Sequence, residues 1–157
     1  MEQFYAIAIT IIGASTPLLI AALGELVVER SGVLNLGVEG MMIMGAVTGF
    51  GAAYLTGNPY IGILAAIFGG MVMSLLFGFL TLTLLANQVA TGLAITLLGV
   101  GLSALLGEGV VGKQIERLPN FHGVDILIIF SFVLVGLVSW FLFRTRYGLM
   151  VRAVGDN

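Results

Sequence analysis

The sequence predicts an all-α fold, a polytopic bundle of transmembrane helices with about five membrane segments. Charged residues make up 9% of the 157 residues and apolar residues 59%, whereas soluble domains carry about 25% and 45–50%. Asp, Glu, Lys, Arg and His are also absent from three long runs, residues 3–24, 40–107 and 126–143. A membrane β-barrel would instead alternate apolar and polar residues over segments of about ten. The continuous apolar runs therefore favour helices.

The expected membrane segments are residues 4–23, 33–55, 60–85, 89–106 and 126–143, since a helix needs about 20 apolar residues to cross the hydrocarbon. The first segment follows Glu2 rather than basic residues, which is unlike a signal peptide. The second is long enough only if it begins near Val33, so it is a candidate for a broken or re-entrant segment. The third is long enough to tilt or break. The fifth, almost entirely Ile, Leu, Val and Phe, is the clearest.

Small residues recur every fourth position in three of these segments. Such spacing lets helix backbones approach closely in lipid, so it predicts tight packing, with the lining of a solute path as the alternative. The three stripes are Gly62, Ala66, Gly70, Ser74 and Gly78; Gly45, Gly49 and Ala53; and Gly99, Ser103 and Gly107.

The basic residues after the fifth segment predict that the C-terminal tail is cytoplasmic. Arg144, Arg146 and Arg152 follow this span directly, and Lys and Arg are enriched in cytoplasmic loops. The loop at residues 107–125 carries charges of both signs and leaves the side of the N-terminus open.

Composition excludes several classes of function. The net charge of −2 argues against a nucleic-acid partner, because such binding needs a basic patch. The chain has no Cys, and its single histidine, His122, lies in a polar loop where a solvated side chain is expected. No metal-ligand spacing, catalytic triad, carboxylate pair or phosphate-binding loop is present. We therefore expect no cofactor and no enzymatic activity, ATP hydrolysis included.

Polar residues between the first two segments form the first candidate site. Acidic residues near a membrane are costly and usually functional, and glycines beside them indicate a broken helix that could line a polar cavity. A solvated loop is the alternative. The residues are Glu25, Glu29, Arg30, Asn35 and Glu39.

Two further regions are candidates. Asn87 and Thr91 lie where the third and fourth segments meet, where an interfacial cap or turn is the alternative to a role in a solute path. The tail RTRYGLMVRAVGDN contains a short amphipathic helix at residues 149–154. A simple membrane anchor would explain Arg144 and Arg146 but not this second apolar stretch.

Three segments together resemble a known family: GELVVERSGVLNLGVEGMMIMGA, ANQVATGLAITLLGVGLSALLG and FRTRYGLMVRAVGDN. They are similar to permeases of the ATP-binding-cassette importers for ribose and branched-chain amino acids, and most similar to the nucleoside-importing subgroup. This resemblance implies three protein partners besides the lipid bilayer: a cytoplasmic ATPase, a second permease subunit and an external substrate-binding lipoprotein of the basic-membrane-protein type.

The resemblance also implies residue roles. Residues 147–157 match the cytoplasmic coupling helix that docks on the ATPase, with Tyr147, Gly148, Arg152, Ala153, Gly155, Asp156 and Asn157 at motif positions. The translocation path is expected near Asn35, Gly37, Glu39 and Gly40, to which the residue patterns add Asn87 and Thr91.

Members of that family are roughly twice as long and continue with further spans after the coupling helix. We therefore expect an N-terminal half, as a fragment, a truncated reading frame or a split gene. The first alternative is a small membrane scaffold or channel-like protein without ATP coupling. The second is half of an ion-coupled secondary transporter, for which Glu39 is the candidate ionisable residue.

Overall fold

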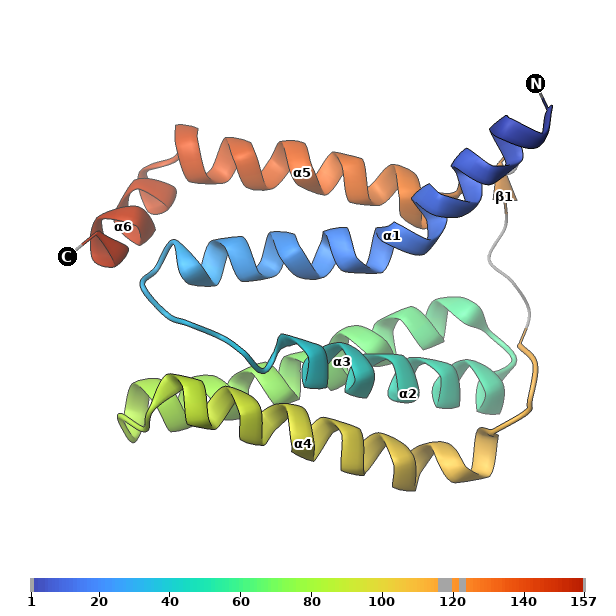
Figure 1. The fold of residues 1–157 in the computed structure, drawn as a ribbon, viewed down its shortest axis with the longest axis horizontal. Helices are drawn as coiled ribbons and strands as arrows, with labels where there is room; N and C mark the ends of the chain where they lie inside the picture. The colour runs from blue at the N-terminus through green and yellow to red at the C-terminus, as the bar shows by residue number, and fades with distance from the viewer. Residues whose placement is uncertain (1, 116–119, 122–123, 157) are drawn as a thin grey trace. The chain divides into compact units, whose positions relative to one another are not determined.

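The computed structural model describes residues 2–115, 120–121 and 124–156, which form two compact units. The first unit comprises Met1–Val33 and Leu118–Asn157, and the second comprises Leu34–Arg117. Helices make up nearly all of the described residues (Figure 1). The exception is a pair of two-residue antiparallel strands, β1 (Asn120–Phe121) and β2 (Val124–Asp125). The predicted all-α class is therefore confirmed.

The first unit is built from a long helix, a second span and a short terminal helix. Helix α1 (Glu2–Glu29) packs along α5 (Ile126–Arg144), and α6 (Arg146–Gly155) follows α5 after a sharp turn (Figure 1). Pro17 lies inside α1 and cannot donate an amide proton to the preceding turn, which accounts for the bend visible in this helix.

Few side chains form the core of the first unit. Leu142 is 1% exposed and Ile128 is 6% exposed, and both belong to α5. Ser131 is fully buried, and its hydroxyl donates a hydrogen bond of 2.7 Å to the Ile128 carbonyl. That bond removes the cost of burying a free hydroxyl.

The second unit has α2 at its centre. Helix α2 (Val38–Thr56) packs against both α3 (Pro59–Gly78) and α4 (Gln88–Gly107). Helix α3 continues as the π-helix η1 (Phe79–Thr83), and α4 continues as the 3-10 turn η2 (Glu108–Val110). The α2–α3 turn uses Gly57 in the left-handed region, with φ 66°, and Asn58 as the N-cap of α3.

Two of the three predicted small-residue stripes, those of α2 and α3, meet at the α2–α3 interface. A methyl group built on Gly49 would lie 2.8 Å from the Ala66 methyl, and one built on Gly62 would lie 2.8 Å from the Ala53 methyl. Tight packing is confirmed for this part of the stripes. It does not extend to the end of α3, where Gly78 has open space around it.

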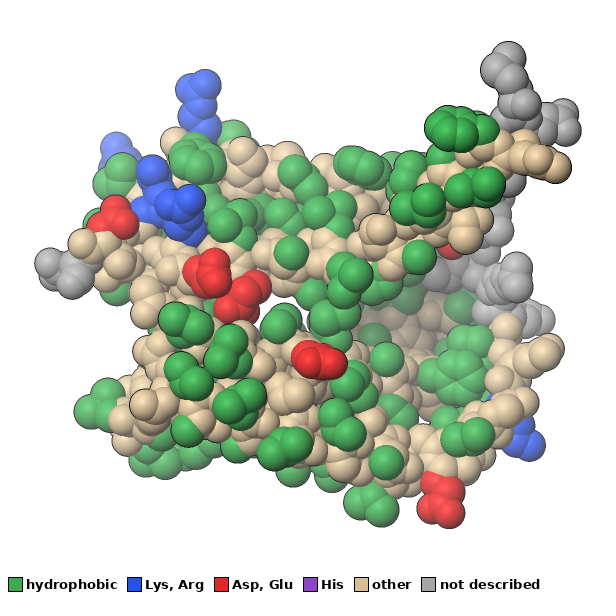
Figure 2. Space-filling model, viewed as in Figure 1, with side chains coloured by type: hydrophobic (Ala, Val, Ile, Leu, Met, Phe, Trp, Pro, Cys, Tyr) green, Lys and Arg blue, Asp and Glu red, His purple; other side chains and the backbone are tan. Residues whose placement is uncertain are grey.

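Five helices are long and apolar enough to cross a membrane, which confirms the expected number among the described residues. They are Gln3–Glu29, Val38–Thr56, Pro59–Thr83, Gln88–Val110 and Ile126–Arg144. Hydrophobic side chains are spread along the helices, whereas several Lys and Arg side chains gather around α6 (Figure 2). Helix α2 begins at Val38 rather than near Val33 and is itself uninterrupted, so the irregular backbone lies before it, at residues 34–37.

Candidate functional site

The irregular segment before α2 is held against α4 by hydrogen bonds. The Leu34 amide donates to the side-chain oxygen of Gln88 at 2.8 Å, and the Thr96 hydroxyl donates to the Leu36 carbonyl at 3.1 Å. Within the segment, the Gly37 amide donates to the Asn35 side-chain oxygen at 3.0 Å. These bonds satisfy backbone groups that would otherwise lack partners in an apolar setting.

Glycines bring this segment and α2 into backbone contact with α4. A methyl group on Gly40 would lie 2.5 Å from the Ile95 carbonyl oxygen, and one on Gly99 would lie 2.5 Å from the Gly40 carbonyl oxygen. A methyl group on Gly92 would lie 2.9 Å from the Leu36 nitrogen. Gly40, Gly92 and Gly99 therefore have no room for a side chain.

The six residues expected in a solute path fall into two groups. Asn35 and Thr91 are 7% and 8% exposed, and Gly37 and Gly40 are also buried. These four residues lie in the packed junction between the segment and α4. Glu39 and Asn87 are exposed instead.

The two exposed path residues differ in what their side chains do. Asn87 caps α4, since its side-chain oxygen accepts from the Ala90 amide at 3.0 Å. Glu39 lies in the first turn of α2, where the positive end of the helix dipole stabilises a carboxylate. Its carboxylate is therefore the exposed charged group of this region.

The polar residues between the first two predicted segments, expected as one candidate site, are divided between the two units. Glu25, Glu29 and Arg30 lie at the end of α1 and just after it, in the first unit. Asn35 and Glu39 lie in the second. Sequence reasoning also missed Gly92, although it stands seven residues before Gly99 and so on the same face of α4.

The tail forms a helix at Arg146–Gly155, which extends beyond the amphipathic stretch expected at 149–154 on both sides. Tyr147, Met150 and Val154 are 73%, 60% and 69% exposed, and their spacing of three and four places them on one face. Ala153 and Asp156 are also exposed, whereas Gly148 is buried. Asn157 and His122 lie outside the described residues.

Arg152 is only partly exposed. Its guanidinium lies 5.1 Å from the centre of the Phe143 ring, close enough for a cation–π attraction. Its Nε is buried and has no hydrogen-bond partner among the described residues. The tail helix therefore separates an outward apolar face from an inward side made of small residues and Arg152.

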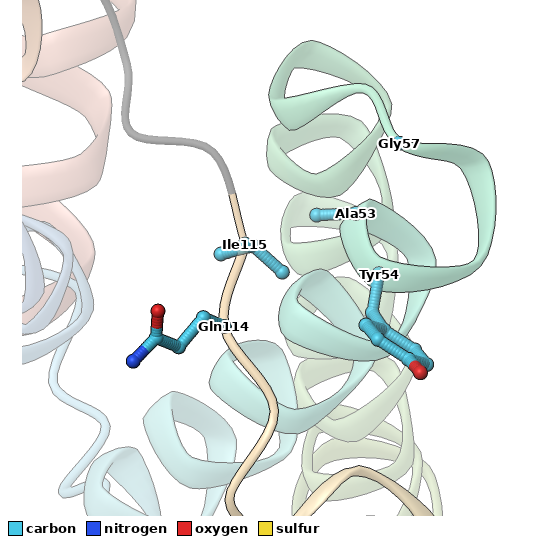
Figure 3. Close-up of a pocket in the computed structure, with 5 residues that line it drawn as sticks. All are labelled: Ala53, Tyr54, Gly57, Gln114 and Ile115. Carbon is cyan, nitrogen blue, oxygen red and sulfur yellow. The ribbon is translucent and has the colours of Figure 1, made fainter.

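A cavity of about 210 Å³ lies at the other end of α2, lined by Ala53, Tyr54, Gly57, Gln114 and Ile115. Figure 3 shows the Tyr54 ring and the Gln114 amide directed to opposite sides, while Ile115 and Ala53 point toward one another. The cavity therefore combines aliphatic, aromatic and amide side chains. No three His, Cys, Asp or Glu side chains gather as metal ligands in the part of the chain that the structure describes.

Curated relatives match most of this chain. A putative glucose ABC transporter permease protein, TsgC13 of Haloferax volcanii, is 39% identical over 92% of the chain and 50% of its own length. The guanosine ABC transporter permease protein NupQ of Bacillus subtilis is 33% identical over 91% of the chain and 53% of its own length. The nucleoside ABC transporter permease protein NupC of Lactococcus lactis is 29% identical over 91% of the chain and 53% of its own length.

The chain thus spans about half the length of the curated relatives it matches. No solved structure gives a significant match. The five apolar helices indicate a multi-pass membrane protein. Residues 7–157 match the family described as the permease component of the branched-chain amino acid transport system, and the chain belongs to this permease family.

Proposed function

We propose that the chain is half of the permease subunit of an ATP-driven importer of nucleosides or related small polar solutes in the cell membrane. A cytoplasmic ATPase of the ATP-binding-cassette type would drive it, with a second permease subunit and an external substrate-binding lipoprotein as further partners. The chain itself would hydrolyse no ATP.

One observation carries this proposal: the exposed apolar face of α6. Tyr147, Met150 and Val154 form a stripe on a ten-residue helix that directly follows a span. An apolar helix face of this kind suits a hydrophobic groove on a soluble partner. The arginines around it favour the cytoplasmic side, where an ATPase would be met.

The docking role is tested by placing negative charges on the apolar stripe. In the complete permease, Met150→Glu together with Val154→Glu should abolish co-purification of the ATPase and ATP-driven uptake, because two carboxylates would be buried without partners. Val111→Glu is the matched control, since Val111 is 78% exposed in the loop after α4. ATPase capture that survives the double substitution would favour a scaffold or channel without ATP coupling.

The proposed path runs beside the junction of α2 and α4. Asn35, Gly37, Gly40 and Thr91 would frame it, because they are buried in that junction. Glu39 and Asn87 would face the solute, because they are exposed. A carboxylate accepts hydrogen bonds from hydroxyl and amino groups, and these are the polar groups that nucleosides and sugars offer.

The solute class is proposed on the printed names of the relatives, which include guanosine, nucleosides and glucose. The test is uptake of labelled guanosine by vesicles containing the complete transporter, in competition with other nucleosides, glucose and leucine. Nucleosides should compete best. Competition by glucose alone would move the proposal to sugars, and competition by leucine alone would overturn it.

A further inference from the structure

The inward side of α6 has a feature that docking on an ATPase does not require. Gly148 and Gly155 lie seven residues apart, on the same side of the helix. They contact two different parts of the first unit. Neither contact involves the exposed stripe of Tyr147, Met150 and Val154.

The first contact joins the start of α6 to the end of α5. A methyl group built on Gly148 would overlap the Phe141 carbonyl oxygen and lie 2.8 Å from the Leu142 Cα. The Thr145 hydroxyl strengthens this corner, since it donates to the Phe141 carbonyl at 2.6 Å and accepts from the Gly148 amide at 3.0 Å. The Thr145 side chain therefore forms hydrogen bonds both at the end of α5 and at the start of α6.

The second contact joins the end of α6 to the turn after α1. A methyl group on Gly155 would overlap the Arg30 carbonyl oxygen and lie 2.9 Å from the Gly32 nitrogen. Conversely, a methyl group on Gly32 would lie 3.2 Å from the Gly155 Cα. The two glycines thus meet backbone to backbone.

The turn that receives Gly155 is well defined. The amides of Arg30 and Gly32 donate to the carbonyls of Leu26 and Glu29 at 3.1 and 3.0 Å. The Ser31 hydroxyl donates to the Val28 carbonyl at 2.6 Å. Gly32 has φ +82°, a left-handed conformation that commonly ends helices and strongly favours glycine.

We propose that Gly32, Gly148 and Gly155 are positioning residues that fasten both ends of α6, so that it moves with α5 and the end of α1 as one body. Seven residues of helix separate the two fastenings, about 10 Å. A helix held at two points this far apart does not tilt without displacing α5 or the turn after α1. The inference rests on the proposed docking role of α6. It assigns the transmission of movement from α6 to α5 and α1 to the three glycines rather than to the docking stripe.

The position of Arg152 agrees with this assignment. It lies four residues after Gly148, on the inward side, with its guanidinium over the Phe143 ring and its Nε buried. Arg152 therefore adds a contact with Phe143 at the end of α5, from a position along α6 between the two glycines.

The fastening is tested on the chain itself, in lipid nanodiscs. The chain has no cysteine, so Leu26→Cys and Val154→Cys place two spin labels at exposed sites on α1 and α6. Pulsed electron paramagnetic resonance should give one narrow distance distribution. Gly155→Ala should lower the equilibrium constant for the fastened position of α6 about tenfold and so broaden the distribution, because overpacking by a methyl group costs about as much free energy as a tenfold change in an equilibrium constant.

Gly24→Ala is the matched control in α1, since Gly24 has open space around it, and it should leave the distribution unchanged. Circular dichroism checks that Gly155→Ala keeps its helices, and Gly32→Ala should give the same loosening from the other side of the contact. A broad distribution in the parent, or an unchanged one in both variants, overturns the proposal.

The complete transporter separates this inference from the docking role. Gly155→Ala should still capture the ATPase, because the stripe is intact, but should import less solute for each ATP hydrolysed, because α6 would no longer move together with α5 and the end of α1. Equal uptake per ATP in Gly155→Ala and Gly24→Ala overturns the positioning role. Failure of the parent to bind any ATPase, with a narrow spin-label distance, would refute the docking role and leave the fastening of α6 standing.

Discussion

The two units use glycine in different ways. In the second unit, glycines on α2, α3 and α4 let three spans cross at backbone distance, as at Gly40 and Gly99. In the first unit, α1 and α5 pack through ordinary side chains such as Ile128, and close backbone contacts occur where α6 meets its neighbours. The second unit is therefore tightly packed along its spans, and the first is tightly packed at one end.

This difference predicts different responses to added volume. A methyl group at a crossing in the second unit pushes two spans apart, and the whole unit has to adjust. A methyl group at a contact of α6 detaches a ten-residue helix while α1 and α5 remain paired. The first change should lower global stability, and the second should open the structure locally.

The largest effect is expected for Gly99→Ala. Its new methyl would lie 2.5 Å from the Gly40 carbonyl oxygen and 2.7 Å from the Gly40 Cα, and neither backbone atom moves without shifting α2. We expect a loss of about 3 kcal/mol in the free energy of unfolding, measured by titration with sodium dodecyl sulfate.

Gly101→Ala is the matched control for this change, because Gly101 is on the same helix and has nothing within 4 Å. It should be neutral or more stable by about 0.5–1 kcal/mol, since Ala favours helix over Gly. Equal losses in the two variants would mean that helix propensity, not close packing, decides stability here.

A smaller and local effect is expected for Gly148→Ala. The methyl would overlap the end of α5, and about 2 kcal/mol of overpacking should lift α6 away from the first unit. Limited trypsin digestion should then cut faster at Arg152, while the helix content by circular dichroism stays close to that of the parent. Gly136→Ala in α5 is the control, because Gly136 has open space around it. An unchanged cleavage rate in Gly148→Ala would contradict close packing of α6.

Much of the fold follows from hydropathy. Long uncharged runs predict five apolar helices, and the spacing of Gly45, Gly49 and Ala53 predicts a close helix crossing. The start of α2 is less predictable. Val33 and Leu34 are apolar and extend the hydrophobic run backwards, but hydrogen bonds from this segment to Gln88 and Thr96 hold it in an irregular conformation. Those bonds span more than fifty residues, so no local pattern reveals them.

The candidate site is predictable in composition but not in orientation. The sequence singles out Asn35 and Glu39 as polar residues near an apolar helix, but it does not say that one is buried and the other exposed. Likewise, the resemblance to a coupling helix singles out Gly148 and Gly155, but it does not say that they are packing contacts. Their packing partners, Phe141 and Arg30, lie on different helices or turns and become visible only in three dimensions.

A further prediction concerns Asn35 in the second unit. Its side-chain oxygen accepts a hydrogen bond from the buried Gly37 amide, so Asn35→Ala leaves that amide without this partner. We expect a loss of about 1 kcal/mol in the free energy of unfolding, measured as for Gly99→Ala. Asn35→Asp retains an acceptor at this position and should recover part of the loss. Equal stability of Asn35→Ala and the parent would show that the Asn35 side chain does not hold this segment.

The smallest effect on stability is expected for Glu39→Gln, which changes an exposed side chain next to a closely packed glycine. Glu39 is exposed and adjoins Gly40, which packs on α4. Removing its charge costs the interaction with the helix dipole, about 0.3–1 kcal/mol. Uptake by the complete transporter should nevertheless fall, because an amide donates hydrogen bonds where the carboxylate only accepts them. Glu108→Gln, at the far end of α4, removes the same charge without touching this region. If both substitutions leave uptake unchanged, Glu39 does not face the solute, and the proposed path has to lie along another face of α2.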